Sequence, residues 1–439
     1  MEALMMAVQL LLALSILVGV HELGHMLAAK YFGMRVEKYS IGFPPKVFGF
    51  KWGETEYSLG AIPLGGFVKI SGMVDESLDT GNLSQEPQPY EFRAKPAWQR
   101  LIVMMGGIIV NIITGIIIFI FLVYIYGIQY LPADEVNKRG IVAHELGQEI
   151  GLKTGDKILE LNGKPFEKFD TALGAEVFLT DNNTYTVQRG DSVFTVKIPN
   201  DLANRLHEDR NNFISAISPF IVEHVEAGTN ADKAGLKPKD QIIGINGTEI
   251  NYYHEFKDYL NSHKGQKVTI TVKRDDKELQ LPAQIDTTGI LGFNPKLTLP
   301  VRTEYFSFWQ SVPKGTSDAF GVILNTVRGF GKIFSGNVGV SKSISGPIGI
   351  ATKFGGEIVW QKFWFLTGLL SMVLAFMNFL PIPALDGGHV MFLLYEMITG
   401  RKPTDKFLEV AQKVGMVILL ALMIFAFGND IFKIVEKIL

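Results

Sequence analysis

The stretch His21-Glu22-Leu23-Gly24-His25 directly follows an uncharged apolar run, Ala3 to Val20, that is long enough to form a membrane helix. Residues four positions apart lie on one face of a helix, so His21 and His25 can direct their imidazoles to one point. Two histidines in this spacing bind Zn²⁺, and Glu22 beside them can act on a water molecule. The stretch predicts a zinc site for peptide hydrolysis, with His21 and His25 as ligands and Glu22 as the catalytic residue.

A second, incomplete copy of this motif serves as an internal comparison for the first copy. His144-Glu145-Leu146-Gly147 repeats four of the five residues, but Gln148 replaces the second histidine, and we interpret that site as a surface turn. Imidazoles and a carboxylate are costly at membrane depth and are kept there mainly for function. The alternative for the first copy is a histidine pair that reaches from a helix end to the membrane interface.

The composition indicates a membrane protein that also carries substantial soluble parts. The chain has 439 residues, of which 47% are hydrophobic, and four apolar spans, namely Ala3 to Val20, Leu101 to Tyr126, Phe363 to Leu385 and Val414 to Phe427. A net charge of −2 argues against nucleic acid as a partner. With no cysteine in the chain, any zinc must be held by His, Asp or Glu.

Basic residues between the spans predict the orientation in the membrane. Nine Lys or Arg lie between Lys30 and Arg100, and three more, Arg401, Lys402 and Lys406, lie between the third and fourth spans. Because basic loops stay in the cytoplasm, both segments are expected there. Both termini and the long block from Gly127 to Gln361 are then expected on the other side, the periplasm if the membrane is a bacterial inner membrane.

Residues Thr55 to Ile70 read as strand, turn and strand, and we expect a membrane-associated β-hairpin. Its turn would contain Pro63, Gly65 and Gly66, and its second strand would begin at Phe67 and Val68. Proline favours an edge position, and an unpaired edge near a protease site can bind an extended substrate as a further strand. The alternative is an ordinary surface hairpin.

The long block contains an internal repeat. Residues Gly151 to Gly163 align with Gly235 to Gly247, and each copy ends in an Asn-Gly hairpin signal. A mixed helical stretch and an alternating strand follow in both copies. Over residues 128 to 300 these sequences resemble PDZ domains, which implies two α+β domains that capture peptide ends or extended segments by strand addition. Leu291-Gly292-Phe293 looks like part of the carboxylate-binding loop of the second copy.

After the repeat, the stretch from Ala319 to Phe334 is amphipathic, and Ser345-Gly346-Pro347-Ile348 follows it. Two interpretations fit this pattern equally well. The segment is either a helix on the outer membrane surface or a helix packed on the two repeated domains.

Two histidines leave a catalytic zinc ion short of one protein ligand. The third span ends in Asn378-Phe379-Leu380-Pro381-Ile382-Pro383-Ala384-Leu385-Asp386-Gly387-Gly388-His389, where prolines and glycines break the helix beside polar groups. Asp386 and His389 both qualify as the third ligand by spacing alone, and the residues do not choose between them.

Together, the motifs resemble the bacterial site-2 protease family, of the regulator of sigma-E protease type, over nearly the whole chain. They are HELGH, Pro-Leu-Gly-Gly-Phe-Val-Lys, the PDZ-like pair, Ser-Gly-Pro-Ile and Asn-x-x-Pro-x-Pro-x-Leu-Asp-Gly-Gly. The resemblance implies that Asp386 is the third zinc ligand and that His389 is a neighbouring residue. It also implies that Asn378, Pro381 and Pro383, with Gly65, Gly66, Phe67 and Val68 of the hairpin, bind the substrate. Interhelical hydrogen bonding by Asn378 and simple helix breaking by the prolines are the alternatives.

One position in the second span departs from the family pattern. Pro commonly follows the first glycine of Gly106-Gly107-Ile108-Ile109-Val110-Asn111, whereas Gly107 stands here. Close helix packing through Gly107, Asn111 and Gly115 is one consequence. We expect the departure to alter local helix geometry and to leave the reaction untouched.

The predicted fold is a polytopic α-helical membrane protein with four transmembrane helices, a membrane-associated β-hairpin and two PDZ-like domains outside the cytoplasm. Its expected segments are 1–126 (first transmembrane pair), 127–204 and 205–300 (PDZ-like domains), 301–360 (juxtamembrane region) and 361–439 (second transmembrane pair). The resemblance implies an intramembrane zinc protease that cleaves single-pass membrane proteins already trimmed on the outside, such as anti-sigma factors and remnant signal peptides. The rivals are a soluble-type zinc peptidase anchored by its helices and a non-catalytic PDZ membrane scaffold.

Overall fold

The computed structural model describes residues 2–73, 86–206, 212–336, 339, 341 and 345–438. These residues form two compact units, which we describe separately. The first unit combines residues 1–128 with 305–439, and the second spans residues 129–304.

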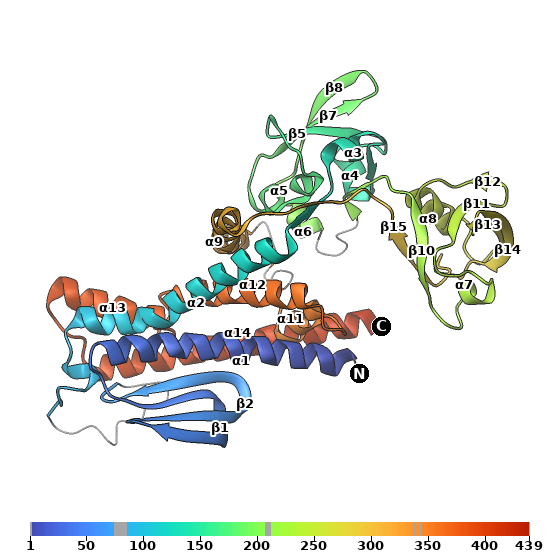
Figure 1. Cartoon of the computed structure of the whole chain (residues 1–439). Helices are drawn as coiled ribbons and strands as arrows, with labels where there is room; N and C mark the ends of the chain where they lie inside the picture. Colours follow the sequence, from blue (N-terminus) through green and yellow to red (C-terminus); the bar gives the residue numbers. More distant parts are fainter. Residues whose placement is uncertain are drawn as a thin grey trace. The chain divides into compact units, whose positions relative to one another are not determined.

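The first unit is mainly helical, with one β-sheet. Its main elements are α1 (Glu2–Tyr31), β1 (Val36–Trp52), β2 (Thr55–Ile70), α2 (Ala97–Tyr126), α9 (Phe308–Phe334), α11 (Pro347–Phe354), α12 (Trp360–Phe379), α13 (Asp386–Thr399) and α14 (Asp405–Ile438) (Figure 1).

Four helices of the described residues are long and apolar enough to cross a membrane, which confirms the four predicted spans. They are α1, α2, α12 and, within α14, Lys406–Val435. The predicted end of the third span at Leu385 is wrong, because α12 ends at Phe379. Leu380 is extended, as expected for a residue that precedes a proline, and Pro381 has no backbone N–H with which to continue the helix.

Helices α1 and α2 approach each other closely at a pair of glycines. A Cβ atom on Gly106 would lie 2.6 Å from the carbonyl oxygen of Gly24, and one on Gly24 would overlap the Gly106 backbone. Only residues without a side chain allow two helix backbones this close. The contact brings the first third of α2 against the HELGH turn of α1.

The sheet differs from the predicted hairpin. Residues 55–70 form one long strand, β2, and its two halves do not pair with each other. Both halves pair instead with residues 38–41 of β1: Ser40, for example, lies between Phe67 on one side and Ser58 on the other. The hairpin turn falls at residues 53–54, between Trp52 and Thr55. The predicted reversal of the chain between Leu59 and Phe67 is present, because the two halves run in opposite directions along residues 38–41. The predicted pairing of the halves as a hairpin is wrong, because residues 38–41 lie between them.

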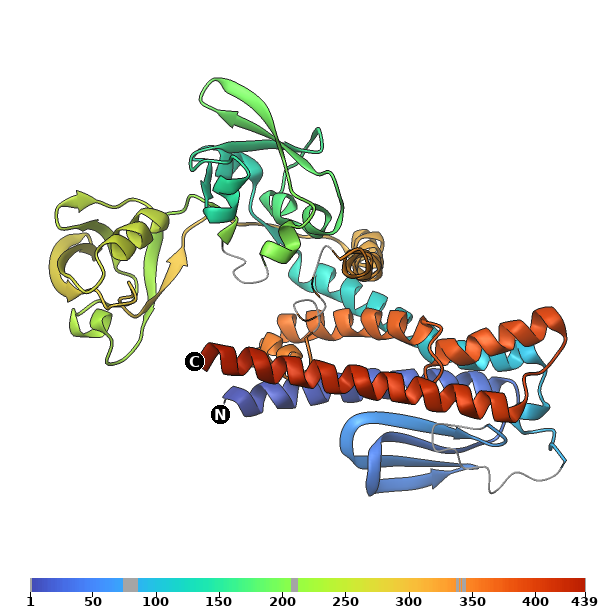
Figure 2. The same cartoon turned by 180° about the vertical axis from the view of Figure 1, so that it is seen from behind.

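One face of this sheet packs on α1, and both views show the sheet lying alongside that helix (Figure 2). Val36, Val68 and Ile70 of the sheet share a buried core with Met26 and Ala29 of α1. The Tyr39 hydroxyl, half-buried at the same face, donates a hydrogen bond to the Gly19 carbonyl at 2.7 Å. The strand segment 66–70 is thereby fixed against the helix that carries HELGH.

The amphipathic segment forms a longer helix than predicted, since α9 begins at Phe308 rather than near Ala319. Within the first unit it packs on α2, where a Cβ on Gly315 would lie 2.5 Å from the Ile120 backbone. It also contacts α12 through Phe330 and Phe376, whose rings are 5.9 Å apart. Both views show α9 end-on and α2 from the side, so the two helices cross steeply.

The Ser-Gly-Pro-Ile motif begins the short helix α11. Pro347 occupies its first turn, where a missing N–H costs nothing. The N–H groups of Gly346 and Gly349 each donate to the carboxylate of Asp430 in α14, at 2.9 Å. The buried Asp430 therefore ties the last transmembrane helix to α11.

The second unit contains two hydrophobic cores, one built from residues 136–214 and one from residues 220–291. The strands that surround the first core are β4 (Ile141–Ala143), β5 (Lys157–Leu161), β6 (Lys164–Pro165), β7 (Thr184–Arg189), β8 (Ser192–Lys197) and β9 (Ile214–Ala216), and its short helices are α3 (Ala133–Asn137), α4 (Glu145–Glu149), α5 (Ala175–Leu179) and α6 (Leu202–Arg205). The elements of the second core are β10 (Phe220–Val225), α7 (Asn230–Lys233), β11 (Gln241–Ile245), β12 (Thr248–Glu249), α8 (Tyr253–Ser262), β13 (Lys267–Arg274), β14 (Lys277–Gln284) and β15 (Phe293–Leu297). Where the chain enters and leaves this unit, β3 (Ile128–Tyr130) pairs with β16 (Arg302–Glu304).

The internal repeat predicted from sequence is present in the structure. The four-stranded sheets have the same order, β6-β5-β7-β8 in the first and β12-β11-β13-β14 in the second. The Asn-Gly pairs have φ values of 55° and 71° at Asn162 and Gly163, and of 47° and 80° at Asn246 and Gly247. Positive φ at both central residues is the type I′ turn that this dipeptide favours.

A buried ion pair that the sequence did not predict also repeats. Arg189 donates two hydrogen bonds of 2.7 Å to Asp156, and Arg274 donates bonds of 2.6 and 2.7 Å to Asp240. Both aspartates are almost fully buried, and two-pronged guanidinium–carboxylate pairs are among the stronger polar contacts in proteins. The pairs link the loop before the first sheet strand to the third strand in each copy.

Candidate metal centre

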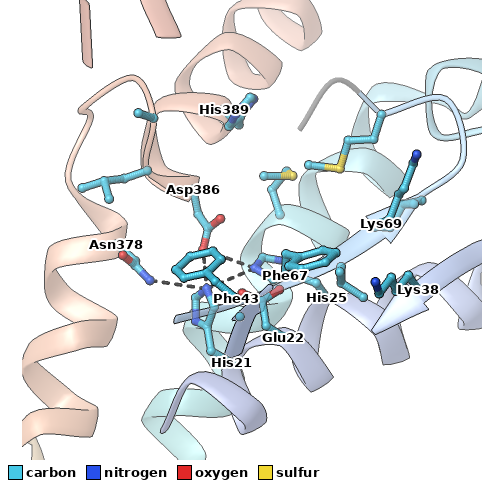
Figure 3. Close-up of a pocket in the computed structure, with 17 residues that line it drawn as sticks. His21, Glu22, His25, Lys38, Phe43, Phe67, Lys69, Asn378, Asp386 and His389 are labelled. Carbon is cyan, nitrogen blue, oxygen red and sulfur yellow. Dashed lines mark hydrogen bonds and ion pairs between the residues drawn. The ribbon is translucent and has the colours of Figure 1, made fainter. Parts of the chain in front are cut away.

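Three potential metal-binding side chains, from two helices that are far apart in the sequence, meet at one point. Asp386, the first residue of α13, places its Oδ2 atom 3.1 Å from Nε2 of His21 and 3.4 Å from Nε2 of His25 (Figure 3). The two Nε2 atoms lie 3.2 Å apart. The described residues contain one cluster of this kind, formed by these three side chains.

The spacing and chemistry of these atoms fit Zn²⁺. Ligand atoms about 2.0–2.1 Å from a tetrahedral zinc ion lie roughly 3.3 Å from one another, close to the three distances observed. The Asp386 Oδ2 atom is buried and has no hydrogen-bond partner among the described residues, although two ring nitrogens face it. A buried carboxylate oxygen that faces two nitrogens without hydrogen bonds is accounted for by a cation between them.

The connection from α12 to α13 fixes the position of Asp386. It comprises residues 380–385 and folds back onto the first turn of α13. A Cβ on Gly388 would lie 2.6 Å from the Ile382 carbonyl oxygen, and one on Gly387 would overlap the Leu380 carbonyl. The two glycines after Asp386 are therefore required by this close approach, and they hold the carboxylate at the start of the helix.

The alternative third ligand, His389, lies on α13 near the same cavity. It does not belong to the three-residue cluster, and Figure 3 shows its ring beyond Asp386, away from the two histidines. Asp386 and His389 are three residues apart on one helix, so the sequence could not separate them. The orientation of the first turn of α13 brings Asp386, and not His389, to the two histidines.

Gly107 of α2 lies directly against both imidazoles. A Cβ at this position would be 2.5 Å from Cε1 of His21 and 2.6 Å from Nε2 of His25. The expectation that the departure at Gly107 leaves the reaction untouched stays a prediction, while the packing adds that any side chain placed at this position would overlap the candidate ligands. Packing between α1 and α2, which the sequence does not reveal, produces this contact.

The three side chains open into a cavity of about 610 Å³. Glu22 lines it, as do Gly66, Phe67, Val68 and Asn378 from the predicted substrate-binding set. The Asn378 Nδ2 atom lies 3.4 Å from Nε2 of His21, so the amide points toward the metal site.

Three predicted substrate-binding residues lie elsewhere. Gly65 packs under the ring of Phe43, where a Cβ atom would overlap the ring. Pro381 and Pro383 belong to the 380–385 connection and are absent from the described lining of the cavity. Their contact with substrate stays a prediction.

Several lining residues were not predicted. Lys38 and Phe43 come from β1, Met104 comes from α2, and Met73 follows β2. None of them belongs to a motif with a fixed spacing, so the sequence offered no signal. Lys38 and Phe43 reach the cavity because β1 is the central partner of both halves of β2, whereas Met104 reaches it because α2 packs against the HELGH turn of α1.

The incomplete second motif is not part of this site. His144 precedes the short helix α4 in the second unit, and its Nε2 atom is hydrogen-bonded to Ser215 at 2.9 Å. The predicted surface turn at 144–147 is thus the start of a helix.

Comparisons with known proteins identify relatives over almost the whole chain. Residues 9–422 match Peptidase family M50. A Neisseria meningitidis protein named "Putative zinc metalloprotease" is 28% identical over 454 residues, which cover 96% of this chain and 98% of the relative. The "Regulator of sigma-E protease RseP" of Salmonella typhimurium is 28% identical over 463 residues, which cover 96% of this chain and 97% of the relative.

The family match includes both segments that build the candidate metal site, α1 with HELGH and the start of α13 with Asp386. The relatives named as zinc metalloproteases agree with the donor set of two imidazoles and one carboxylate. The chain belongs to Peptidase family M50, the site-2 protease family, and it is a membrane zinc metalloprotease.

Proposed function

We propose that this protease hydrolyses peptide bonds within or next to the transmembrane segments of other membrane proteins. The observation that carries the proposal is the position of the three converging donor atoms, which belong to α1 and to the end of the α12–α13 connection, two segments of the membrane-spanning unit. A metal site built there is reached most directly by a peptide that is itself in the membrane. The regulator of sigma-E protease among the relatives supports the same class of activity.

In the proposed mechanism His21, His25 and Asp386 hold the zinc ion. Bound Zn²⁺ would supply a Lewis acid that polarises the scissile carbonyl and makes the attacking water more acidic. Glu22 follows His21 in α1 and lines the same cavity, which supports its role as the general base. Its carboxylate takes a proton from the attacking water and delivers it to the leaving amine, so no covalent intermediate is required.

The substrate must arrive extended, because a helical backbone keeps its carbonyls in hydrogen bonds. Segment 66–70 of β2 pairs with β1 on one side, and no other described strand pairs with it. Gly66, Phe67 and Val68 of that segment line the cavity. We infer that an unwound substrate pairs with the side of this segment that faces away from β1, next to Glu22, which the Val68 backbone also contacts.

Asn378 is the second proposed contact with the substrate backbone. Its amide N–H groups point to the metal site from the end of α12, opposite the sheet edge (Figure 3). An amide donor there can hold a carbonyl oxygen of the substrate or the charge that develops on it during attack.

The second unit would act as a size filter. Its repeated sheets support the interpretation as two PDZ-like domains, although the first core extends to Ile214, beyond the expected boundary between 127–204 and 205–300. We propose that both domains lie outside the cytoplasm at a bacterial inner membrane. They would admit membrane proteins whose outer domains have been removed, such as anti-sigma factors and remnant signal peptides.

The proposed function is tested with the purified full chain and a single-span substrate. We expect cleavage within the span by the wild type and a rate lowered by about 10²–10⁴-fold in Glu22→Gln, with zinc content unchanged. Cleavage confined to soluble globular proteins would favour an anchored soluble-type peptidase. Zinc binding without any cleavage, and equal behaviour of Glu22→Gln, would favour the non-catalytic scaffold.

Strand pairing is tested by Val68→Pro, with Val68→Ala as the control for the lost side chain. Proline removes the backbone N–H of Val68 from the edge segment, and because the Val68 backbone also contacts Glu22, some loss of rate on every substrate is expected. We expect Val68→Pro to slow cleavage of a helical transmembrane substrate more than cleavage of an unstructured peptide. An equal loss on both substrates would contradict edge pairing.

The orientation is tested with single cysteines, because the chain contains none. Lys51, Lys237 and Arg401 are exposed and lie in the sheet, the second unit and the α13–α14 connection. A membrane-impermeant thiol reagent should label Lys237→Cys in intact cells, and Lys51→Cys and Arg401→Cys only after permeabilisation. Labelling in the opposite order would overturn the proposed orientation.

A further inference from the structure

One face of α2 lies next to the Nδ1 atoms of His21 and His25, the ring nitrogens that do not face Asp386. Val103, Gly107 and Asn111 are four residues apart and so share that face. His25 directs its Nδ1 atom to the Val103 carbonyl oxygen at 2.8 Å. A carbonyl only accepts, so Nδ1 of His25 carries the hydrogen and Nε2 keeps the lone pair that a metal needs.

His21 has a different neighbour at the corresponding nitrogen. Its Nδ1 atom lies 3.2 Å from the side-chain amide of Asn111, which is completely buried. The structure places Nδ2 of the amide toward the ring, and Oδ1 accepts no hydrogen bond from the described residues. The amide oxygen is therefore available to an imidazole N–H.

The two orientations of the Asn111 amide correspond to two tautomers of His21. With Nδ2 toward the ring, the amide donates to Nδ1, and the ring hydrogen sits on Nε2, where it blocks metal binding. With the amide turned by 180°, Oδ1 accepts from Nδ1–H and leaves Nε2 free for the metal. Only the second orientation is compatible with His21 as a ligand.

The backbone of Asn111 is held in place from a third helix. The Ser371 hydroxyl of α12 donates a hydrogen bond of 2.8 Å to the Asn111 carbonyl oxygen, and both residues are fully buried. One turn earlier, Gly107 leaves room for the two imidazoles. The amide thus faces His21 from a fixed backbone position.

We propose that Asn111 is a positioning residue of the metal centre, whose amide oxygen accepts a hydrogen bond from Nδ1–H of His21 and so keeps Nε2 as the metal-binding nitrogen. This inference rests on the proposed function insofar as His21 is a zinc ligand. It gives α2, which contributes no ligand, a direct influence on zinc affinity. Partners of this kind on metal-bound histidines typically change metal affinity by about 10–100-fold.

The test measures zinc affinity of the purified full chain by competition with a chelator, together with the thermal midpoint of the metal-free protein. The variants are Asn111→Leu, which removes the acceptor at similar volume, Asn111→Ala, which removes it without bulk, and Asn111→Asp, which retains an acceptor. Thr367→Val is the matched control, because Thr367 is a fully buried polar residue of α12 whose hydroxyl bonds to Phe363 of its own helix at 2.8 Å.

We expect Asn111→Leu and Asn111→Ala to bind zinc about 10–100-fold more weakly than the wild type, and Asn111→Asp to recover most of that loss. Thr367→Val should retain wild-type affinity. Wild-type affinity in both Asn111→Leu and Asn111→Ala, or Asn111→Asp as weak as Asn111→Leu, would overturn the inference while zinc loss in His21→Ala still supports the proposed function. Full zinc binding by His21→Ala would overturn both.

Discussion

Replacing Gly107 by alanine tests how tightly α2 packs on the candidate zinc ligands. The new Cβ would begin 2.5 Å from Cε1 of His21 and 2.6 Å from Nε2 of His25. Relaxed contacts between such atoms are about 3.5 Å, so the rings or the helix must move by roughly 1 Å. Zinc–ligand distances tolerate shifts of only about 0.2 Å, so this displacement is several times what the site can absorb.

We therefore expect Gly107→Ala to weaken zinc binding by at least 10–100-fold, which corresponds to about 1.4–2.7 kcal/mol. The thermal stability of the metal-free protein should change less than zinc affinity, because alanine in place of glycine favours a helix by up to about 1 kcal/mol. The assay is chelator competition on the purified chain, followed by the thermal midpoint of the metal-free form.

Two other glycine-to-alanine changes serve as controls. Gly428 of α14 has no described heavy atom within 4 Å of the new Cβ, and Gly115 of α2 would meet the flexible side chain of Met372. Both variants should bind zinc as the wild type does. Wild-type affinity in Gly107→Ala would refute the close contact between α2 and the imidazoles, and equal zinc loss in Gly115→Ala would show that any change in α2 disturbs the site.

Four further predictions concern the ligands, the metal and the second unit. Asp386→Ala should lose zinc, whereas His389→Ala should retain about one zinc per chain by metal analysis; the reverse would make His389 the ligand. Chelation of the wild type should abolish proteolysis and added Zn²⁺ should restore it, and full activity in the zinc-free protein would exclude the proposed mechanism. Tyr185 is fully buried and its hydroxyl donates to the Ala172 carbonyl at 2.5 Å, so Tyr185→Phe should lower the free energy of unfolding of the second unit by about 1–2 kcal/mol in a denaturant titration, and an unchanged midpoint would contradict this. Burial raises the pKa of the Tyr185 phenol, so the stability that it contributes should be present below about pH 10, the ordinary tyrosine value, and fall at higher pH, which Tyr185→Phe should remove.

The sequence by itself determined the local features, because backbone periodicity and turn chemistry act over a few residues. The spacing of His21 and His25 fixed their common helix face, and the lengths of the apolar runs identified the four spanning helices. The Asn-Gly pairs fixed the two tight turns, since positive φ is accessible to these residues. Proline at 381 marked the break in the third span, although not the residue at which α12 ends.

Only the tertiary structure decided which distant segments meet. Residues 38–41 became the centre of the sheet because they pair with both halves of β2, and no local signal reports such a partner. Asp386 rather than His389 faces the two histidines because the 380–385 connection folds back on Gly387 and Gly388. The closeness of Gly107 and Asn111 to the imidazoles likewise arises from helix packing between α1 and α2, whose energy depends on the fit of two surfaces far apart in the chain.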